Sequence, residues 1–497
     1  MEASKSTIGT PCPLSHIDRW DGECDVLIVG FGAAGACAAI EAAEAGARVQ
    51  LFEAGAGAGG ASALSGGEIY LGGGTPIQRA AGFVDDTEDL YNYLQMAGGA
   101  KVDEAKVRCY ANGSLDHFDW LVRQGVSYKG SYIAEKIVEP ETDDTLIWSG
   151  SEEAWPFSEK ARPAPRGHVV QWTGMGGGRL LMDVLEARAI ALGVDVHCNS
   201  RALRLIVDEK GAVHGAVVRQ DGTERFVRAH GGVILATGGF VMNPDMLAQY
   251  APDTLRLCDP LGANDDGSGI MMGLSVGAAA VHMDEFLTTC PWYPPGSLVK
   301  GIFINQDGQR FINEDSYHGR VCRHALDQPG DRVYLLVDNE IFGRPPEYSR
   351  IDIAAVGESW ADVESELGMT PGSLTATVDL YNRHAANGED PQWHKAAKWI
   401  KPLTAPPYAA LEFCIGYSYF VFLTLGGLKT SVASEVFKPD GQVIPGLYAA
   451  GRATSGLPAC GYGYSSGMSL ADCTFFGRSA GRAAAARAGA STACEQI

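Results

Sequence analysis

Short apolar runs bounded by small residues predict buried strands in the first half of the chain. Residues 26–29 (VLIV) end at Gly30, and residues 233–236 (VILA) precede a threonine and two glycines. A continuous apolar run between turn residues is typical of a strand covered on both faces of a parallel sheet. The alanine-rich residues 33–45 predict a helix, because alanine has the highest helix propensity. With a second strand predicted at residues 48–53, the pattern indicates a strand–helix–strand unit.

Helical spacing of apolar positions recurs further along the chain, at residues 85–97, 103–124, 179–192, 268–280 and 469–488. Two polar segments lie outside this pattern. We expect the leader up to residue 22 to be poorly ordered and residues 127–166 to cross the surface. From residue 282 the texture changes to mixed strands and helices with several prolines. We therefore predict an α/β fold in which residues 22–280 and 411–497 form one domain and residues 281–410 form an inserted α+β domain.

The charge and the cysteine pattern exclude several classes of function. The 497 residues carry a formal net charge of −21, which repels phosphate groups, so we expect no nucleic-acid partner. The cysteines occur singly, without a CxxC pair or a histidine cluster, so we predict reduced thiols and no metal site. The first 19 residues lack a basic segment followed by an apolar one. Weakly polar stretches reach only about 14 residues, too few to span a bilayer. We therefore expect a cytoplasmic protein without an integral membrane segment.

The turn after the first predicted strand carries a dinucleotide-binding pattern. Gly30, Gly32 and Gly35 form GxGxxG between strand and helix, and Glu53 ends the second strand. The first glycine permits the tight turn, the second lets a pyrophosphate approach the backbone, and the third packs the helix against the strand. An acidic residue at the position of Glu53 accepts hydrogen bonds from ribose hydroxyls and disfavours a 2′-phosphate. NAD and FAD remain as candidates, and a tight turn without a ligand is the alternative.

Further tracts of small residues favour FAD over NAD. FAD is long and needs backbone contacts far from the first turn, and three tracts can supply them: residues 59–67 (GGASALSGG), 236–239 (ATGG) and 446–452 (GLYAAGR). A fourth cluster, residues 174–178 (GMGGG), could form a nicotinamide site. No acidic residue follows it at the required spacing, and we interpret it as structural. We therefore predict FAD as the cofactor and an electron acceptor other than a nicotinamide.

The order of these motifs resembles the fumarate reductase and succinate dehydrogenase flavoprotein superfamily. The likeness extends from about residue 25 to residue 481 and also includes residues 262–269 (GANDDGSG), 308–314 (GQRFINE) and 444–452 (IPGLYAAGR). The resemblance implies a Rossmann-like FAD-binding domain with an inserted catalytic (cap) domain, and an active site where the two domains meet.

The same resemblance implies a set of cofactor-binding residues. The adenine would lie near Ala202, the ribose at Glu53 and the flavin ring near Gly67, Arg452, Ser469 and Leu470, with the diphosphate near residues 33–35 and Ser62. The full set that the resemblance assigns to FAD is Gly30, Gly32, Ala33, Ala34, Gly35, Glu53, Gly60, Ala61, Ser62, Ser65, Gly66, Gly67, Ala202, Ala236, Thr237, Gly238, Asp266, Gly451, Arg452, Ser469 and Leu470.

The chain departs from the fumarate reductases where those enzymes bind a dicarboxylate with arginine and histidine. The corresponding residues 460–469 (CGYGYSSGMS) and 422–429 (FLTLGGLK) contain neither. Guanidinium groups are suited to carboxylate recognition, so we expect no small dianionic substrate. Hydroxyl groups suit a neutral, apolar ketone, and this pattern resembles the 3-ketosteroid dehydrogenases, with residues 464–467 most like the Δ4-(5α)-dehydrogenases. The resemblance implies three catalytic residues: Tyr317, Tyr464 and Ser466.

This resemblance implies dehydrogenation of a 5α-3-ketosteroid to the 4-ene-3-ketosteroid. The 3-keto group acidifies C4, the hydroxyl groups would take the C4 proton, and a hydrogen-bond donor would stabilise the developing enolate. The C5α hydrogen would leave as a hydride to flavin N5. Three alternatives stay open: a Δ1-dehydrogenase, a fumarate-reductase-like enzyme, and a flavin-binding subunit that only carries electrons.

Several other residues have two interpretations each. Tyr462 is a further hydroxyl of the catalytic segment or a packing residue. The aromatic residues within 417–422 and 292–293 line a steroid pocket or form a buried strand face. Asp265 and Asp266 precede a predicted helix, and we expect such a pair to cap the helix rather than to bind a metal ion.

Overall fold

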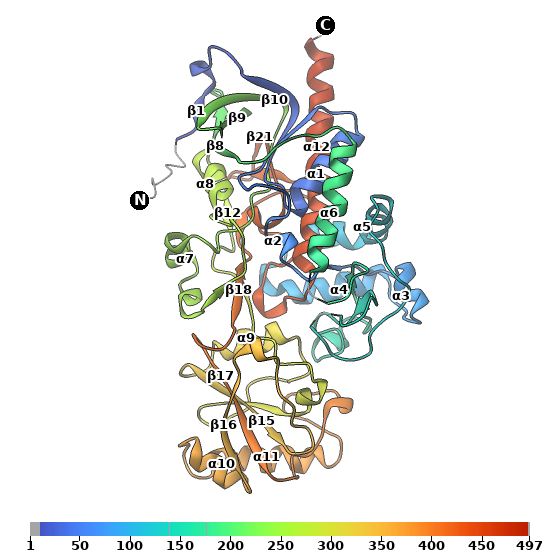
Figure 1. Cartoon of the computed structure of the whole chain (residues 1–497), viewed down its shortest axis with the longest axis vertical. Helices are drawn as coiled ribbons and strands as arrows, with labels where there is room; N and C mark the ends of the chain where they lie inside the picture. The colour runs from blue at the N-terminus through green and yellow to red at the C-terminus, as the bar shows by residue number, and fades with distance from the viewer. Residues whose placement is uncertain (1–9, 139, 175, 496–497) are drawn as a thin grey trace.

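The computed structural model describes residues 10–138, 140–174 and 176–495. The molecule is elongated, with a large sheet and its helices at one end and a small sheet with two helices at the other (Figure 1). The fold is mixed α/β, as the sequence predicts. Residues 1–9 of the predicted leader lie outside the described residues.

The large sheet is organised around β2 (Gly22–Val29), which directly precedes α1 (Ala33–Glu44) and β3 (Val49–Phe52). β3 pairs with β2 in parallel, and on the other side β2 pairs in parallel with β10 (Thr223–Leu235). β21 (Val443–Ala449) then pairs in parallel with β10, so the last part of the chain returns to this sheet one strand away from β2. The remaining strands of this sheet are β1 (Cys12–Pro13), β7 (Asp195–His197), β8 (Ser200–Val207), β9 (Val213–Gln220) and β20 (Glu435–Phe437).

The parallel pairing places four strand ends at one edge of the large sheet. Val29, Phe52, Leu235 and Ala449 are aligned through their registers. Ligands of open α/β sheets bind at the carboxyl ends of the strands, so this edge is where a dinucleotide is expected. The long helix α12 (Met468–Glu495) packs against α1 on one face of this sheet, beside α6 (Gly177–Ala191) (Figure 1).

Shorter elements surround this core. A three-stranded sheet consists of β4 (Glu68–Tyr70), β6 (Gly167–Val169) and β5 (Leu146–Ile147). The helices near it are α2 (Gly60–Ala63), α3 (Pro76–Ala80), α4 (Thr87–Gly98) and α5 (Glu104–Arg123). Two further helices, α7 (Pro244–Tyr250) and α8 (Ser268–Ser275), lie on the side of the chain that leads to the small sheet (Figure 1).

The small sheet is antiparallel, in the order β14 (Ile302–Asn305), β15 (Arg332–Asp338), β17 (Tyr408–Cys414) and β16 (Asp352–Gly357). It carries α10 (Trp360–Glu366) and α11 (Ser373–Ala385), and α9 (His318–Ala325) lies between it and the large sheet (Figure 1). The predicted domain boundary between residues 410 and 411 falls within β17. The connecting strands are β11 (Asp259–Pro260), β13 (Phe286–Thr289) and β18 (Val421–Thr424), with the pair β12 (Ala280–Val281) and β19 (Gly427–Leu428).

Three expectations from the sequence are wrong. The leader is ordered from residue 10, because Cys12 pairs with Ile206 of β8 and Leu14, Ile17 and Trp20 cover a small apolar cluster there. Residues 145–166 are not a surface excursion, because they contribute β5 and the fully buried Arg166. The helix predicted at 268–280 ends at Ser275, because the chain turns at Gly277, which has a φ of 85°.

Candidate active site

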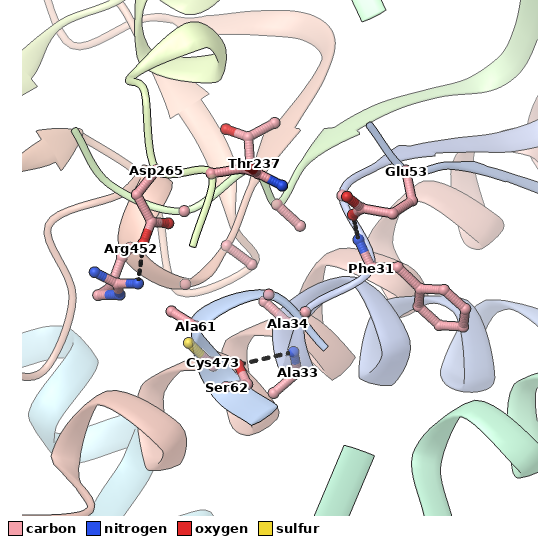
Figure 2. A pocket seen from close by; sticks show the side chains of 18 residues that line it. Phe31, Ala33, Ala34, Glu53, Ala61, Ser62, Thr237, Asp265, Arg452 and Cys473 are labelled. Atoms are coloured by element: carbon pink, nitrogen blue, oxygen red, sulfur yellow. Dashed lines mark hydrogen bonds and ion pairs between the residues drawn. The ribbon is translucent and has the colours of Figure 1, made fainter. Parts of the chain in front are cut away.

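A cavity of about 550 Å³ opens at the edge of the large sheet where the parallel strands end. The turn between β2 and α1 forms one wall, Glu53 after β3 a second, and residues 236–238 after β10 a third (Figure 2). The N-terminal turn of α1 therefore faces the cavity, and the unpaired amides of such a turn favour an anionic group. Of the residues predicted to bind FAD, thirteen line this cavity: Gly30, Gly32, Ala33, Ala34, Glu53, Gly60, Ala61, Ser62, Ala236, Thr237, Gly238, Gly451 and Arg452.

The glycines of the turn leave space that side chains would fill. A Cβ atom on Gly30 would lie 2.4 Å from the carbonyl oxygen of Ala236, and Gly30 has a φ of 102°. A Cβ on Gly32 would point towards Ser62, 3.5 Å from its hydroxyl oxygen. Ser62 accepts a hydrogen bond from the Ala33 amide at 3.2 Å (Figure 2). The cradle is therefore formed by backbone and one hydroxyl group.

Glu53 is fixed by hydrogen bonds to the backbone on both sides. Its Oε2 accepts from the Phe31 amide at 2.7 Å, and its Oε1 accepts from the Gly55 amide at 2.6 Å (Figure 2). The carboxylate therefore holds the loop after β2 against the loop after β3. Its oxygens have further lone pairs, which leaves acceptor capacity for ribose hydroxyls.

Two buried polar atoms in this region have no hydrogen-bond partner among the described residues: Thr237 Oγ1 and Arg452 Nη1. Arg452 is oriented by an ion pair from its Nη2 to Asp265 Oδ2 at 2.8 Å (Figure 2). Buried polar atoms are nearly always satisfied in native structures, so both atoms indicate a polar ligand. Together with the glycine cradle and the acceptor Glu53, this donor set fits FAD.

Other predicted cofactor residues lie elsewhere. Ser65, Gly66, Ser469 and Leu470 line a second, adjoining cavity, whereas Gly35, Gly67, Ala202 and Asp266 line neither of the two. Asp266 forms an ion pair with Arg201 and accepts a hydrogen bond from the Ser268 amide at 3.0 Å, at the start of α8. The neighbouring Asp265 lines the first cavity instead, which the sequence did not distinguish.

The second cavity is larger, about 1380 Å³, and shares Ala61, Ser62, Arg452 and Cys473 with the first. It lies between the large-sheet region and the segments that lead to the small sheet. Its lining is mostly apolar, with Leu64, Leu261, Leu287, Val421, Leu423 and Leu470 among the side chains. Its apolar lining fits an apolar ligand, held with one end beside the first cavity.

All three predicted catalytic residues line this second cavity. The hydroxyl groups of Tyr317 and Ser466 are 2.9 Å apart and hydrogen-bonded. The Tyr464 hydroxyl donates to Ser469 Oγ at 2.9 Å, and the rings of Tyr317 and Tyr464 are 6.3 Å apart. The structure thus brings together hydroxyl groups from two segments almost 150 residues apart.

Both phenol groups are held in the protonated form. Burial, together with the charge of the neighbouring Tyr464, raises the pKa of Tyr317 well above 10. Burial also raises the pKa of Tyr464, but hydrogen bonding to Ser469 and the positive charge of Arg452 oppose that increase. Both groups are hydrogen-bond donors at neutral pH. The positive charge of Arg452 favours negative charge at the Tyr464 oxygen, so Tyr464 is suited to stabilise an oxyanion by donating a hydrogen bond to it.

Two ionisable residues of the cavity were missed by the sequence analysis. Glu68 is 7% exposed, and its negative charge raises the pKa of both Tyr317 and Tyr464. The His318 ring lies against Tyr317, with ring centres 4.2 Å apart and planes inclined by 41°, and burial lowers the pKa of His318 to about 3, so its ring is neutral. The sequence could have indicated both residues, because Glu68 directly follows the predicted tract 59–67 and His318 directly follows Tyr317.

The positions of the aromatic residues and of the glycine cluster 174–178 decide between the interpretations given for them. Tyr419 lines the second cavity, whereas Trp292 and Phe420 are buried in the core. Gly177 and Gly178 pack against the backbone of residues 62–66, where Cβ atoms would come within 2.5 Å of carbonyl oxygens, which supports a structural role for this cluster. Residue 175 of the same cluster lies outside the described residues.

The part of the chain that the structure describes contains no metal-binding cluster and no membrane-spanning helix. No group of three His, Cys, Asp or Glu side chains is close enough to hold a metal ion. The cysteine side chains described there are all free thiols. No helix among these residues combines the length and the apolar character needed to cross a bilayer.

Comparison with known proteins agrees with this geometry. Residues 25–466 match the family described as FAD binding domain. The structure is similar to that of a 3-ketosteroid-Δ4-(5α)-dehydrogenase from Rhodococcus jostii RHA1 in complex with 4-androstene-3,17-dione, with a TM-score of 0.90 and 42% identity over 96% of this chain and 100% of that chain.

Two curated relatives represent both branches of the resemblance. A 3-oxo-5-alpha-steroid 4-dehydrogenase of Comamonas testosteroni is 27% identical, over 87% of this chain and 93% of the relative. A probable fumarate reductase of Shewanella frigidimarina is 29% identical, over 93% of this chain and 75% of the relative. The chain therefore belongs to the FAD-binding family of flavoprotein oxidoreductases that contains the 3-ketosteroid dehydrogenases and the fumarate reductases.

Proposed function

We propose that this protein dehydrogenates 5α-3-ketosteroids to 4-ene-3-ketosteroids, with FAD as its cofactor. The observation that carries the proposal is the hydrogen-bonded pair of Tyr317 and Ser466, at 2.9 Å, with Tyr464 beside it in a mostly apolar cavity that adjoins the FAD cavity. The Rhodococcus jostii enzyme, 42% identical over its whole length, supports the same substrate class, because its structure contains 4-androstene-3,17-dione.

The proposed domain arrangement follows from the position of the two cavities. Residues 22–280 and 411–497 would form a Rossmann-like FAD-binding domain, and residues 281–410 an inserted catalytic (cap) domain. In support, β2, α1 and β3 form a parallel strand–helix–strand unit, and the second cavity has lining residues from both parts of the chain. An apolar substrate enclosed between two parts is shielded from water, which strengthens every electrostatic interaction with it.

The residues of the first cavity would hold FAD through its polar parts. Glu53 would accept hydrogen bonds from the ribose, the N-terminal turn of α1 would face the diphosphate, and Thr237 and Arg452 would donate from their unpartnered atoms. The predicted contacts of Gly35, Gly67, Ala202 and Asp266 are proposed with the rest of the set. Bound FAD supplies the two-electron acceptor for the hydrogen that leaves C5.

The hydrogen bonds of the Tyr317, Tyr464 and Ser466 hydroxyl groups give them two different roles in the proposed reaction. Ser466 and Tyr317 are bonded to each other, so as Ser466 takes the C4 proton it can give its own hydroxyl proton to Tyr317, and Tyr317 can pass its phenol proton to solvent water. Tyr464 is outside this pair and retains its proton; with substrate bound, its hydroxyl would exchange its donation to Ser469 Oγ for one to the C3 carbonyl oxygen as the enolate forms. One such donor stabilises a developing oxyanion by on the order of 3 kcal/mol.

The apolar lining also argues against a small dianionic substrate. Residues 460–469 and 422–429 contribute no arginine or histidine, and the buried carboxylate of Glu68 would repel a dicarboxylate. We expect a cytoplasmic enzyme that passes its electrons to an acceptor other than a nicotinamide, because Gly177 and Gly178 are occupied with packing against residues 62–66.

Product analysis tests this proposal. The purified holoenzyme is incubated with a ketosteroid whose A ring is fully saturated, together with an artificial electron acceptor, and the products are separated. We expect the 4-ene-3-ketone. A 1-ene product would assign the Δ1 reaction instead, and reduction of fumarate by reduced viologen would assign the fumarate-reductase reaction. Ser466→Ala should retain bound FAD and give no product.

A further inference from the structure

The proposed proton-transfer pair is divided between two elements that meet only in the folded chain. Tyr317 is the residue immediately before α9, and Ser466 lies three residues after the short helix η9 (Gly461–Gly463). Their hydroxyl groups are 2.9 Å apart although 149 positions separate them in sequence. A hydroxyl pair transfers a proton only within hydrogen-bond distance, so the pair depends on how α9 and η9 are held together.

Tyr462, at the centre of η9, is bound by α9 at both its backbone and its side chain. Arg320 Nη1 donates to the Tyr462 carbonyl oxygen at 3.1 Å. The Tyr462 hydroxyl donates to both carboxylate oxygens of Asp327, just beyond the end of α9, at 2.9 and 3.0 Å. The guanidinium carbon of Arg323 lies 4.5 Å from the centre of the Tyr462 ring. α9 and the residues just after it therefore contact Tyr462 at three places: its carbonyl oxygen, its hydroxyl group and its ring.

The charges around Tyr462 strengthen its hydrogen bond. The Arg323 guanidinium is also 3.8 Å from the Asp327 carboxylate, so a positive charge lies beside this hydrogen bond. Burial raises the pKa of Tyr462 to about 12, against the opposing charge of Arg323, so the phenol remains a donor. A hydrogen bond to an ionised acceptor is about twice as strong as a neutral one.

The rest of η9 is packed too tightly to move without its neighbours. A Cβ atom on Gly461 would lie 2.0 Å from the Phe286 carbonyl oxygen, and one on Gly463 would lie 1.9 Å from that of Ala97. The Gly461 amide also donates to Glu285 Oε2 at 2.9 Å. Because η9 and its neighbours are tightly packed, a displacement of Tyr462 also displaces the residues that follow it, including Tyr464 and Ser466.

A second anchor acts on the backbone of the pair. The Tyr317 amide donates to Ser151 Oγ at 2.9 Å, and the Ser466 amide donates to the Ser149 carbonyl oxygen at 2.8 Å. This anchor fixes the backbones of Tyr317 and Ser466 against residues 149–151 independently of Tyr462. Loss of the Tyr462 contacts would therefore loosen the hydroxyl pair without releasing the fold.

We propose that Tyr462 is a positioning residue that, through Asp327 and Arg320, sets the distance between the Tyr317 and Ser466 hydroxyl groups. The proposal rests on the proposed ketosteroid dehydrogenation. Tyr462 does not line the second cavity, so its role is to place the residues that do. Because the contact lies outside that cavity, steroid binding should not depend on it.

The test is a pair of matched substitutions in the holoenzyme. Tyr462→Phe removes only the hydroxyl, and Asp327→Ala removes the acceptor. Both should lower kcat about tenfold, with the KM for the 5α-3-ketosteroid and the FAD content unchanged. Asp327→Asn keeps an acceptor oxygen and should retain at least half of the wild-type kcat. The double variant Tyr462→Phe with Asp327→Ala should be no slower than either single variant, because the two residues form one contact.

Three results would overturn the proposal: wild-type kcat in Tyr462→Phe, a raised KM with unchanged kcat, or equal losses in Asp327→Asn and Asp327→Ala. Amide hydrogen exchange provides a readout that does not need turnover. Tyr462→Phe should increase exchange several-fold in peptides covering residues 318–325 and 461–467, and unchanged exchange contradicts the proposal. If the wild-type protein fails to oxidise the steroid, the proposed function fails, while the exchange measurement still decides the role of Tyr462.

Discussion

The cavity that we propose for FAD (the FAD cavity) and the cavity that we propose for the steroid (the substrate cavity) share a wall at Arg452 and Cys473, but they are built in different ways. The FAD cavity is formed mainly by backbone at strand ends, with glycine and alanine giving access to it. The substrate cavity is formed by side chains, and its reactive hydroxyl groups come from two distant segments. A backbone site is encoded locally by the spacing of small residues, whereas a side-chain site exists only after tertiary packing.

The largest effect is expected where the backbone cradle is filled. In Gly35→Ala the new Cβ would lie 1.9 Å from the Gly30 carbonyl oxygen, so α1 cannot pack against the turn. We expect loss of bound FAD, seen as loss of the visible flavin absorbance, and a markedly lower Tm. Gly46→Ala is the control, since Gly46 has a φ of 86° and open space around it. It should cost about 1 kcal/mol and retain the flavin. A yellow Gly35→Ala protein of normal Tm would contradict the backbone account.

The next largest effect is expected in the side-chain site. Tyr464→Phe removes the proposed donor to the steroid carbonyl but no FAD-cavity residue, so kcat should fall about 10² to 10³-fold while the flavin spectrum is retained. Tyr419→Phe, in the same cavity, is the matched control. It should change kcat less than about threefold, because substitutions that remove no specific interaction have small effects. Turnover by Tyr464→Phe at the wild-type rate would remove Tyr464 from the mechanism.

These two sites explain how much the sequence could predict. Gly30, Gly32 and Glu53 meet in one cavity because strand, turn and helix are contiguous in sequence, whereas Gly35 of the same pattern does not line it. Tyr317, Tyr464 and Ser466 entered through resemblance, and the residues alone did not identify their hydrogen bonds. Whether each predicted FAD residue contacts the cofactor stays a prediction.

Other features depend on long-range packing that a local pattern does not contain. Residues 145–166 appeared polar enough for the surface, yet Arg166 is buried because Asp85, more than eighty residues earlier, forms an ion pair with it at 2.6 Å. The choice between Asp265 and Asp266 depends on Arg452 and Arg201, neither of which is near in sequence. Tyr462 was ambiguous for the same reason, because its partner Asp327 lies on another element.

A smaller effect is expected at the buried ionisable residue Glu152, whose neighbour Ser151 accepts a hydrogen bond from the Tyr317 amide. Burial raises the pKa of Glu152 to about 7 from 4.5, although the Gly150 amide donates to it. As pH rises from 4.5 to 7, the unfolded chain releases this proton before the folded chain, so the stability of the folded state falls. The free energy of unfolding of Glu152→Gln minus that of wild type should therefore be about 2 kcal/mol larger at pH 8 than at pH 5. Denaturant unfolding at both pH values measures this gain, and an equal difference at both contradicts it.

The smallest effect is expected at the unpartnered hydroxyl of the FAD cavity. Thr237→Val replaces that hydroxyl with a methyl group of similar size. If Thr237 Oγ1 binds FAD, the Kd of the apoprotein for FAD should rise about fivefold, which corresponds to about 1 kcal/mol. The apoprotein itself should be no less stable, since a buried unsatisfied group is removed. Titration of apoprotein with FAD, followed by flavin fluorescence, gives the Kd, and an unchanged value argues against this contact.

Anaerobic titration of the purified holoenzyme with a 5α-3-ketosteroid tests the central claim most directly. The account predicts that the flavin absorbance bleaches in proportion to added steroid until one equivalent is reached, while the absorbance of a conjugated 4-ene-3-ketone appears in equal amount. A flavin spectrum that stays oxidised at saturating steroid would contradict it.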